Sequence, residues 1–197
     1  MRTLAPDFYR RPVLRVAPEL IGCTVEHKGV AGVIVETEAY HHSEPACHAF
    51  IGLTPRTRTL FGPAGVAYVY RSYGIHLMLN AVCEAEGVGA AVLIRALLPQ
   101  SGLDLMRARR AGSSGREPRE LDLCSGPGKL TQALGISLSD NASSLRDGPV
   151  RIRARSASWR DPDLVTSPRV GITKAVELPW RFSLAGSRYV SRPLPRP

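Results

Sequence analysis

The chain has 197 residues, of which 44% are hydrophobic and 22% charged, and it carries a net charge of +9 at pH 7. This length and composition fit one globular domain, and the longest apolar stretch, residues 87–94, is too short to span a bilayer. The first residues lack the apolar core of a signal peptide, so we expect a protein of the cell interior. The basic charge favours polyanionic partners, although an arginine-rich chain with three lysines is also what a GC-rich genome encodes.

The first forty residues predict a helix followed by a hairpin. Apolar residues at irregular helical spacing indicate a helix within residues 5–20. The segment Gly22–Tyr40 then contains β-branched runs separated by Lys28-Gly29, a pair typical of a tight turn. We expect the second strand of this hairpin to end at Glu36 and Glu38.

The middle of the chain predicts strands, and the rest mixes helices with loops. Residues 46–58 are polar and contain proline, so a loop with a helical turn is expected. Alternating aromatic residues predict a strand over 65–74 with a tight turn at its end, a partner strand over 75–83, and a buried strand over 89–99 that ends at Pro99. The pattern further predicts a basic helix (102–110), a flexible loop (113–120), a short helix within 123–136, a loop (138–149) and two strand-like pieces (150–154 and 181–183).

Together these elements predict an α/β fold of the α+β kind, with helices around an antiparallel sheet. A single domain is expected over residues 1–191. The remaining residues, 192–197, are rich in proline and arginine and are predicted to form a disordered tail.

One stretch, VETEAYHHSEPACH at residues 35–48, gathers carboxylates, rings and imidazoles in a basic chain. On a strand, alternate side chains share a face, so Ile34, Glu36, Glu38 and Tyr40 are expected to point the same way. Glu36 and Glu38 would then lie about 7 Å apart. This spacing suits one carboxylate that does chemistry and one that pairs with an arginine. The alternative is two solvated acids at a strand edge.

The same stretch also raises the question of a metal. Three histidines and a cysteine are candidate ligands, but no second pair stands at ligand spacing, so no metal and no cofactor are predicted. The four cysteines form no CxxC pair and are expected to be buried thiols. A metallohydrolase that uses the histidines stays open as an alternative. The residues concerned are His41, His42, His48, Cys23, Cys47, Cys83 and Cys124.

Several short motifs, taken together, resemble the alkyladenine DNA glycosylase family, the mammalian type of 3-methyladenine-DNA glycosylase. The resemblance covers residues 14–191 and rests on the order and spacing of the motifs. It implies a compact domain with a curved antiparallel sheet and a protruding hairpin that enters the DNA minor groove. The motifs are VETEAY (35–40), AxH (46–48), TPR (54–56), YVYxxYG (68–74), Asn80, LIRALLP (93–99), CSGPGKLTQALGI (124–136), RVGI (169–172) and PWRF (179–182).

The resemblance also implies an activity: hydrolysis of the N-glycosidic bond of alkylated or deaminated purines in double-stranded DNA. The family acts as a monomer and needs no metal. Glu38 matches the family's catalytic acid-base residue. In that role a carboxylate can stabilise positive charge on the sugar and deprotonate the attacking water. Arg95 matches the active-site arginine, and the carbonyl of Val170 is expected to complete the water site. Glu36 is expected to pair with an arginine.

A base in duplex DNA must be flipped out of the stack before its bond can be cleaved. By resemblance, Tyr40, His48 and Tyr70 form the walls of the base pocket, where stacking on rings is worth about 1–3 kcal/mol per base. Asn80 matches a residue that discriminates against the exocyclic amino group of guanine. Tyr73 matches the residue that intercalates into the gap left by the flipped base.

Basic residues in the motifs are expected to contact the DNA backbone. Lys129 follows a glycine-rich turn at a predicted helix start, an arrangement that binds phosphate. Arg56 and Arg58 are further candidates, with plain surface charge as their alternative. Two positions depart from the family pattern: Ile75 and His76 stand where methionine and tyrosine are expected. The loop 49–53 differs as well, so the range of lesions is open.

The opposing functional hypothesis is a non-catalytic nucleic-acid-binding module on the same scaffold. Such a module would have no need for a carboxylate beside the pocket. No lysine stands in the motifs as a Schiff-base nucleophile, so a glycosylase without strand cleavage is expected. The composition and the short N-terminus indicate a bacterial, cytoplasmic, nucleoid-associated protein.

Overall fold

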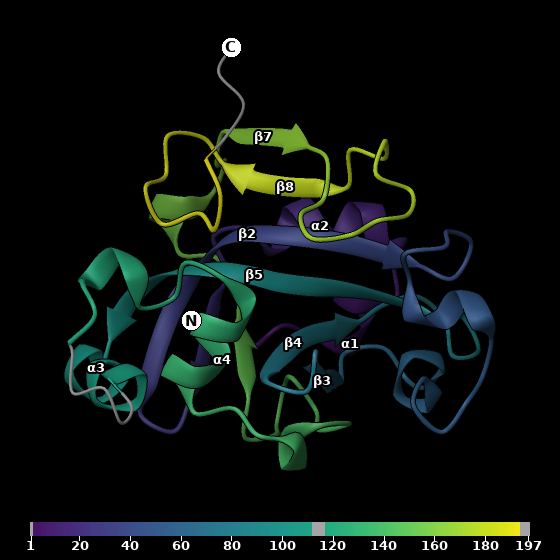
Figure 1. Ribbon diagram of the computed structural model, residues 1–197, viewed down its shortest axis with the longest axis horizontal. Coiled ribbons are helices and arrows are strands. Elements are labelled where there is room, and N and C mark those ends of the chain that lie inside the picture. The colour runs from purple at the N-terminus through teal and green to yellow at the C-terminus, as the bar shows by residue number, and fades with distance from the viewer. Residues whose placement is uncertain (1, 112–116, 194–197) are drawn as a thin grey trace.

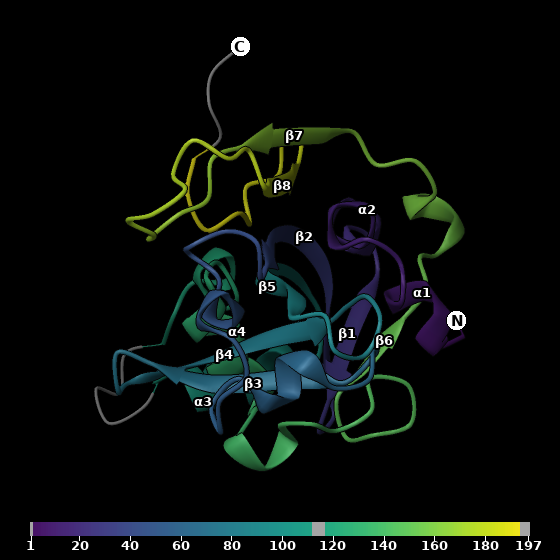
Figure 2. The ribbon, with the colours of Figure 1, turned by 90° about the vertical axis from the view of Figure 1, so that its right-hand side faces the viewer.

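The computed structural model describes residues 2–111 and 117–193. Within them an open, curved antiparallel sheet of eight strands runs in the order β3-β4-β5-β2-β1-β6, and β8 joins β7 to the edge of β2 (Figures 1 and 2). The α+β class predicted from the sequence is confirmed. The strands are β1 (Thr24–His27), β2 (Val30–His41), β3 (Ala67–Ser72), β4 (His76–Val82), β5 (Ala90–Ser101), β6 (Arg151–Arg153), β7 (Leu164–Ser167) and β8 (Arg181–Leu184).

Helices pack around this sheet and build one main hydrophobic core with it. The α-helix α2 lies against β2 and β5, and α4 lies against β4 and β5 (Figure 1). The helices are α1 (Pro6–Tyr9), α2 (Val13–Leu20), α3 (Leu103–Ala111) and α4 (Pro127–Leu134), with short 3₁₀ helices η1 (His48–Ile51), η2 (Arg58–Phe61), η4 (Glu120–Asp122), η5 (Leu138–Asp140) and η6 (Ala157–Trp159).

The helix predicted over residues 5–20 is two helices, and in this respect the prediction is wrong. Pro12 stands between α1 and α2, and it lacks the N–H that a continuous helix would need. Proline also disfavours helical backbone in the residue before it, so the chain breaks there and restarts. One face of α2 is buried through Val13, Val16 and Leu20.

The hairpin β1–β2 forms as predicted, with Lys28 at φ 45° and Gly29 at φ 81° in its turn. Two predicted strand ends are wrong. The strand β2 continues to His41, so its carboxylates lie within the strand, and β5 continues past Pro99 to Ser101. Proline is tolerated there because it pairs with Gly32 at a register shift, where the ladder is irregular.

Strands β2 and β5 share a second irregularity that positions the site. Ile34 pairs with Leu97, but Glu36 pairs with Ala96 and Thr37 pairs with Ile94, so neither Val35 nor Arg95 has a partner in the register. Such bulges re-aim side chains. Ile34 therefore joins the main core, and the prediction that it shares a face with Glu36 is wrong.

Other predicted segments can now be placed. The pieces predicted at 150–154 and 181–183 are β6 and β8, whereas β7 was not predicted. All four cysteines are free and buried, as expected. The described residues contain no helix long and apolar enough to cross a membrane. Of the loop predicted over 113–120, residues 113–116 lie outside the described residues. Of the tail predicted over 192–197, residues 194–197 lie outside them.

Candidate active site

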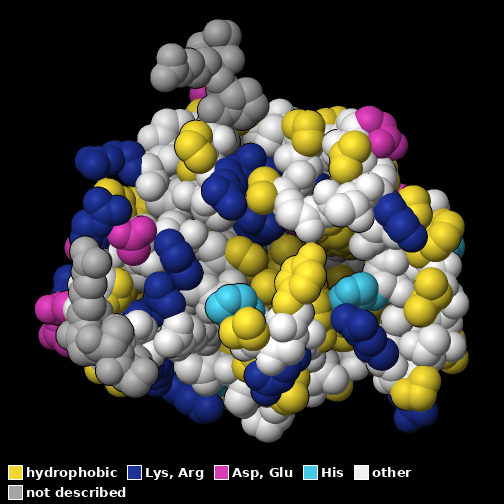
Figure 3. All heavy atoms as spheres, in the orientation of Figure 1, with side chains coloured by type: hydrophobic (Ala, Val, Ile, Leu, Met, Phe, Trp, Pro, Cys, Tyr) yellow, Lys and Arg dark blue, Asp and Glu magenta, His cyan; other side chains and the backbone are white. Residues whose placement is uncertain are grey.

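A cavity of about 720 Å³ opens on one face of the sheet, where strands β2 to β5 meet the loop after β7. Figure 3 shows this hollow, with hydrophobic side chains inside and with histidine, lysine and arginine side chains around it. Most residues predicted for the site line it: Tyr40, His48, Arg56, Tyr70, Tyr73, Asn80, Arg95 and Val170. The structure thus brings together side chains that lie up to 130 positions apart in the sequence.

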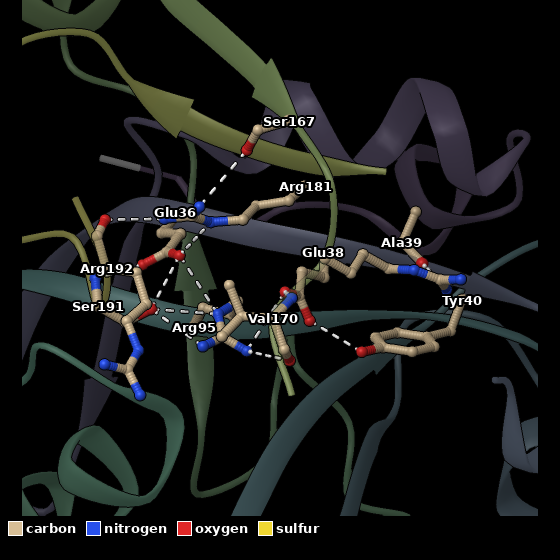
Figure 4. A network of polar contacts seen from close by, with 11 residues as sticks. Glu36, Glu38, Ala39, Tyr40, Arg95, Ser167, Val170, Arg181, Ser191 and Arg192 are labelled. Carbon is tan, nitrogen blue, oxygen red and sulfur yellow. Dashed lines mark hydrogen bonds and ion pairs between the residues drawn. The ribbon is translucent and has the colours of Figure 1, made fainter. Parts of the chain in front are cut away.

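Glu38 lies directly behind this lining and is fully buried. One carboxylate oxygen, Oε2, accepts a hydrogen bond from the Tyr40 hydroxyl at 2.8 Å. The other, Oε1, accepts one from the backbone N–H of Val170 at 2.7 Å and lies 3.3 Å from Nη1 of Arg95 (Figure 4). Burial, followed by the Glu38 charge, raises the pKa of Tyr40 far above its usual value, so the phenol keeps its proton and remains a donor.

Glu36 has a different environment, although it is equally buried. Its carboxylate accepts hydrogen bonds from Nε of Arg181 at 2.6 Å and Nε of Arg95 at 3.2 Å. It also accepts from the backbone N–H and the hydroxyl of Ser191, at 2.6 and 2.9 Å. The predicted pairing of Glu36 with arginine is confirmed, and it ties Arg95 to the C-terminal segment (Figure 4).

Aromatic rings form the side of the cavity opposite these acids. The rings of Tyr68 and Tyr70 stack with centroids 5.2 Å apart, and His48 meets Tyr70 edge-on at 4.6 Å. Burial, then Tyr68, raises the pKa of Tyr70 to about 12. Burial, then Arg56, lowers the pKa of His48, which favours a neutral ring. Its Nδ1 lies 3.2 Å from the Tyr68 hydroxyl, and its Nε2 faces Arg56 at 3.4 Å.

Two further predicted residues sit on β4 and on the hairpin turn. The Asn80 amide donates to the carbonyl of Tyr68 at 3.0 Å, so its side chain is held in one orientation. Tyr73 occupies the β3–β4 turn at φ 48°, with Gly74 at φ 72° behind it, which is the backbone of a tight hairpin turn. This turn leaves Tyr73 91% exposed and Ile75 71% exposed beside the cavity.

The predicted backbone contacts divide into two groups. Arg56 lines the cavity, whereas Arg58 is exposed on η2 outside the lining. Lys129 also lies outside it, and its amine is 3.2 Å from the Ser125 hydroxyl and 3.5 Å from the Asp122 carboxylate. Contact with the DNA backbone stays a prediction for Arg56 as well as for Lys129 and Arg58.

Comparison with known proteins identifies the family. A family model described as Methylpurine-DNA glycosylase matches residues 7–188. The chain belongs to this family. A protein of Rhodopseudomonas palustris strain HaA2 is 57% identical over 94% of this chain and 89% of its own length. One from Bradyrhizobium diazoefficiens is 53% identical over 99% and 94%, and one from Methanoculleus marisnigri is 52% identical over 96% and 99%. All three carry the name "Putative 3-methyladenine DNA glycosylase".

Membership of the methylpurine-DNA glycosylase family makes the chain a hydrolase that acts on N-glycosyl bonds, with DNA as its class of substrate. The family recognised from the sequence motifs is confirmed. The match of residues 7–188 spans every element that contributes to the cavity wall except Arg192.

Sequence reasoning about this glycosylase missed several residues at the cavity. Lys174 and Arg192 line it, from the loop after β7 and from the C-terminal segment. Lys174 stands two residues after the RVGI motif, a position that could have signalled it, whereas Arg192 fell in the tail expected to be disordered. His76 also lines the cavity, and its ring packs on Gly128, where an added Cβ would lie 2.9 Å from a ring carbon.

The three histidines do not come together as one ligand set. The rings of His41 and His42 lie 4.3 Å apart, and Nδ1 of His41 lies 2.7 Å from the Ser43 hydroxyl, whereas His48 contacts the Tyr68 hydroxyl at 3.2 Å. Among residues 2–111 and 117–193, no group of three or more histidine, cysteine or acidic side chains is placed to hold a metal ion. The metallohydrolase alternative therefore has no geometric support within the described chain.

Proposed function

We propose that the protein is a monofunctional DNA glycosylase that acts as a monomer and initiates base excision repair. It flips an alkylated or deaminated purine into the cavity and hydrolyses the N-glycosidic bond with a water activated by Glu38. The observation that carries the proposal is the convergence of three groups at one wall of the aromatic cavity. These are the Glu38 carboxylate, the Arg95 guanidinium, and the Val170 carbonyl 3.5 Å from Arg95.

The cavity supports base flipping through its size and its rings. A volume of about 720 Å³ is within the range of pockets that hold small organic ligands. Tyr40, His48 and Tyr70 line the cavity with rings, and stacking on rings offsets part of the cost of taking a base out of the duplex. The relatives named for 3-methyladenine support a methylated purine as the occupant.

The chemistry follows from the charge that develops. When the C1′–N bond breaks, its electron pair leaves with the base and positive charge grows on the sugar. The buried Glu38 carboxylate stabilises that charge and accepts a proton from the water whose oxygen bonds to C1′. In the proposal, Arg95 and the Val170 carbonyl hold this water in line.

The hairpin turn supports a wedge role. Tyr73 is a large ring held out into solvent next to the cavity, and an inserted side chain can fill the gap left by a flipped nucleotide. In the proposal, Asn80, whose amide donates to the Tyr68 carbonyl, clashes with the exocyclic amino group of guanine. Normal guanine would then be excluded from the pocket.

The experiment is single-turnover base release from duplex oligonucleotides that carry hypoxanthine, ethenoadenine or 7-methylguanine, with EDTA present. Wild type is expected to release the base and leave an unbroken abasic strand, while Glu38→Gln binds lesion DNA but releases nothing. Tight binding by wild type without release from any lesion would instead support the non-catalytic binding module. A cleaved strand would contradict the monofunctional mechanism and direct attention to the Lys174 amine at the cavity.

A further inference from the structure

An ion pair between Glu44 and Arg169 lies just outside the cavity, and the mechanism above does not use it. Nη1 and Nη2 of Arg169 donate to the two carboxylate oxygens of Glu44 at 2.7 and 2.9 Å, and both side chains are at least 95% buried. Nη1 also donates to the carbonyl of Ala39 on β2 at 3.0 Å. Neither Arg169 nor Glu44 lines the cavity, so neither is placed to touch the DNA.

Arg169 contacts both groups that hydrogen-bond to Glu38. Its guanidinium carbon lies over the Tyr40 ring at 4.6 Å, with the Trp180 ring on another side at 5.3 Å. Its own peptide unit continues into the Val170 N–H, which donates to Glu38. Movement of Arg169 would therefore shift the Tyr40 hydroxyl and the Val170 amide together.

Stability alone does not explain such a pair. Burying two charges costs several kcal/mol per ion, and a well-packed apolar pair of the same volume is often as stable. What the pair supplies is a rigid, planar fork with a fixed position, since a guanidinium bonds a carboxylate through two parallel hydrogen bonds. Geometry at Glu38 matters, because a misplacement of about 1 Å can cost about 100-fold in rate.

We propose that Arg169, clamped by Glu44, is a positioning residue that holds the Tyr40 hydroxyl and the Val170 amide on the Glu38 carboxylate. The inference rests on the proposed function, in which Glu38 must be ionised to activate water. The groups that face Glu38 are Tyr40 from β2, Arg95 from β5, and Val170 with Arg169 from the loop after β7.

The test is Arg169→Lys, which keeps the charge but loses the fork and the flat face over Tyr40. We expect the maximal single-turnover rate of hypoxanthine release to fall about 10- to 100-fold with unchanged affinity for lesion DNA. The loss is expected in the rate at saturating enzyme, with the enzyme concentration that gives half of that rate unchanged, because the displaced donors act on the chemical step and not on binding.

A control pair exists at the β6 edge of the sheet. Arg153 forms a similar bidentate pair with Glu26, at 2.6 and 2.7 Å, where β6 meets β1 and away from the cavity. Arg153→Lys is expected to keep both the maximal rate and the half-saturating enzyme concentration of wild type. A second variant, Glu44→Asp, keeps the charge and withdraws the carboxylate by one methylene, and it is expected to act like Arg169→Lys.

The outcomes separate this inference from the proposed function. If wild type releases no base, the proposed function itself fails. If wild type is active but folded Arg169→Lys and Glu44→Asp match the Arg153→Lys control in maximal rate, the pair positions nothing. A loss of rate matched by an equal loss of circular-dichroism signal would also overturn the proposal, because it would report unfolded protein rather than a displaced donor.

Discussion

The replacement Glu36→Gln tests how much stability the buried carboxylate contributes. Glutamine keeps the shape but removes the negative charge, leaving the buried Arg181 guanidinium without the carboxylate it pairs with and Arg95 with Glu38 alone. Breaking a buried ion pair from one side typically costs about 3–5 kcal/mol. For a protein of this length, each kcal/mol lost from the free energy of unfolding lowers the melting temperature by about 2–4 °C. The melting temperature of Glu36→Gln is therefore expected to fall by about 6–20 °C.

The assay is urea unfolding followed by circular dichroism, at neutral pH and with an unchanged m-value as evidence of two-state behaviour. Glu26→Gln is the matched control, because it breaks a bidentate pair with Arg153 whose side chains are 24% and 32% exposed. We expect it to cost about 1 kcal/mol or less. A loss below about 1 kcal/mol for Glu36→Gln would refute the reasoning, since it would mean that Arg95 and Arg181 find other partners or water.

Three further predictions concern the face of the cavity. Tyr73→Ala is expected to leave stability within about 0.5 kcal/mol of wild type, because the ring is exposed, yet to weaken binding of lesion DNA more than of undamaged duplex. Lys174→Ala and Arg192→Ala are each expected to reduce the slope of log affinity against log salt by about 0.9, the value for one lost phosphate contact. His48 has a lowered pKa in the folded state, so the unfolded chain binds a proton at this residue more readily than the folded protein does. The free energy of unfolding should therefore fall as the pH drops below 6.5. His48→Gln should reduce that loss, as measured by urea unfolding at several pH values.

Each of these predictions has a clear contrary result. Equal loss of affinity for damaged and undamaged duplex would contradict the wedge role of Tyr73. The salt series includes Arg10→Ala as a control, because Arg10 pairs with Asp7 on α1. An equal change of slope in that variant would contradict the claim that Lys174 and Arg192 contact phosphate at the cavity. Identical acid sensitivity in wild type and His48→Gln would mean that His48 is not the group responsible.

The central strands could be predicted from the sequence because their signals are local. The turn at Lys28-Gly29 specifies the β1–β2 hairpin, and the turn at Tyr73-Gly74 specifies β3–β4, each through residues that accept positive φ. The ends of β2 and β5 could not be predicted. Pro99 normally ends a strand, and only its pairing with Gly32 at an irregular register makes it acceptable.

The candidate site was predictable where a motif carried it and not where tertiary contacts built it. Tyr40, two positions from Glu38 in sequence, was found because the VETEAY motif carries both residues. The Glu44–Arg169 pair was missed because its members are 125 positions apart, and nothing local marks either as buried. Arg192 was missed because a proline-rich C-terminal segment is typical of a disordered tail. In the structure, Nη2 of Arg181 donates a hydrogen bond to the carbonyl oxygen of Arg192 at 2.9 Å.

The two acids of β2 differ in the hydrogen bonds that remain open to them. A carboxylate has room for about four hydrogen bonds. Glu36 already accepts four, from Arg95, Arg181 and two groups of Ser191. Glu38 accepts two, with the Arg95 guanidinium 3.3 Å away. Oε2 of Glu38 accepts only the Tyr40 hydrogen bond, whereas Oε1 of Glu36 alone accepts three, from Arg95, Arg181 and the Ser191 hydroxyl. This difference supports the proposal that Glu36 is structural and that Glu38 takes the proton from water.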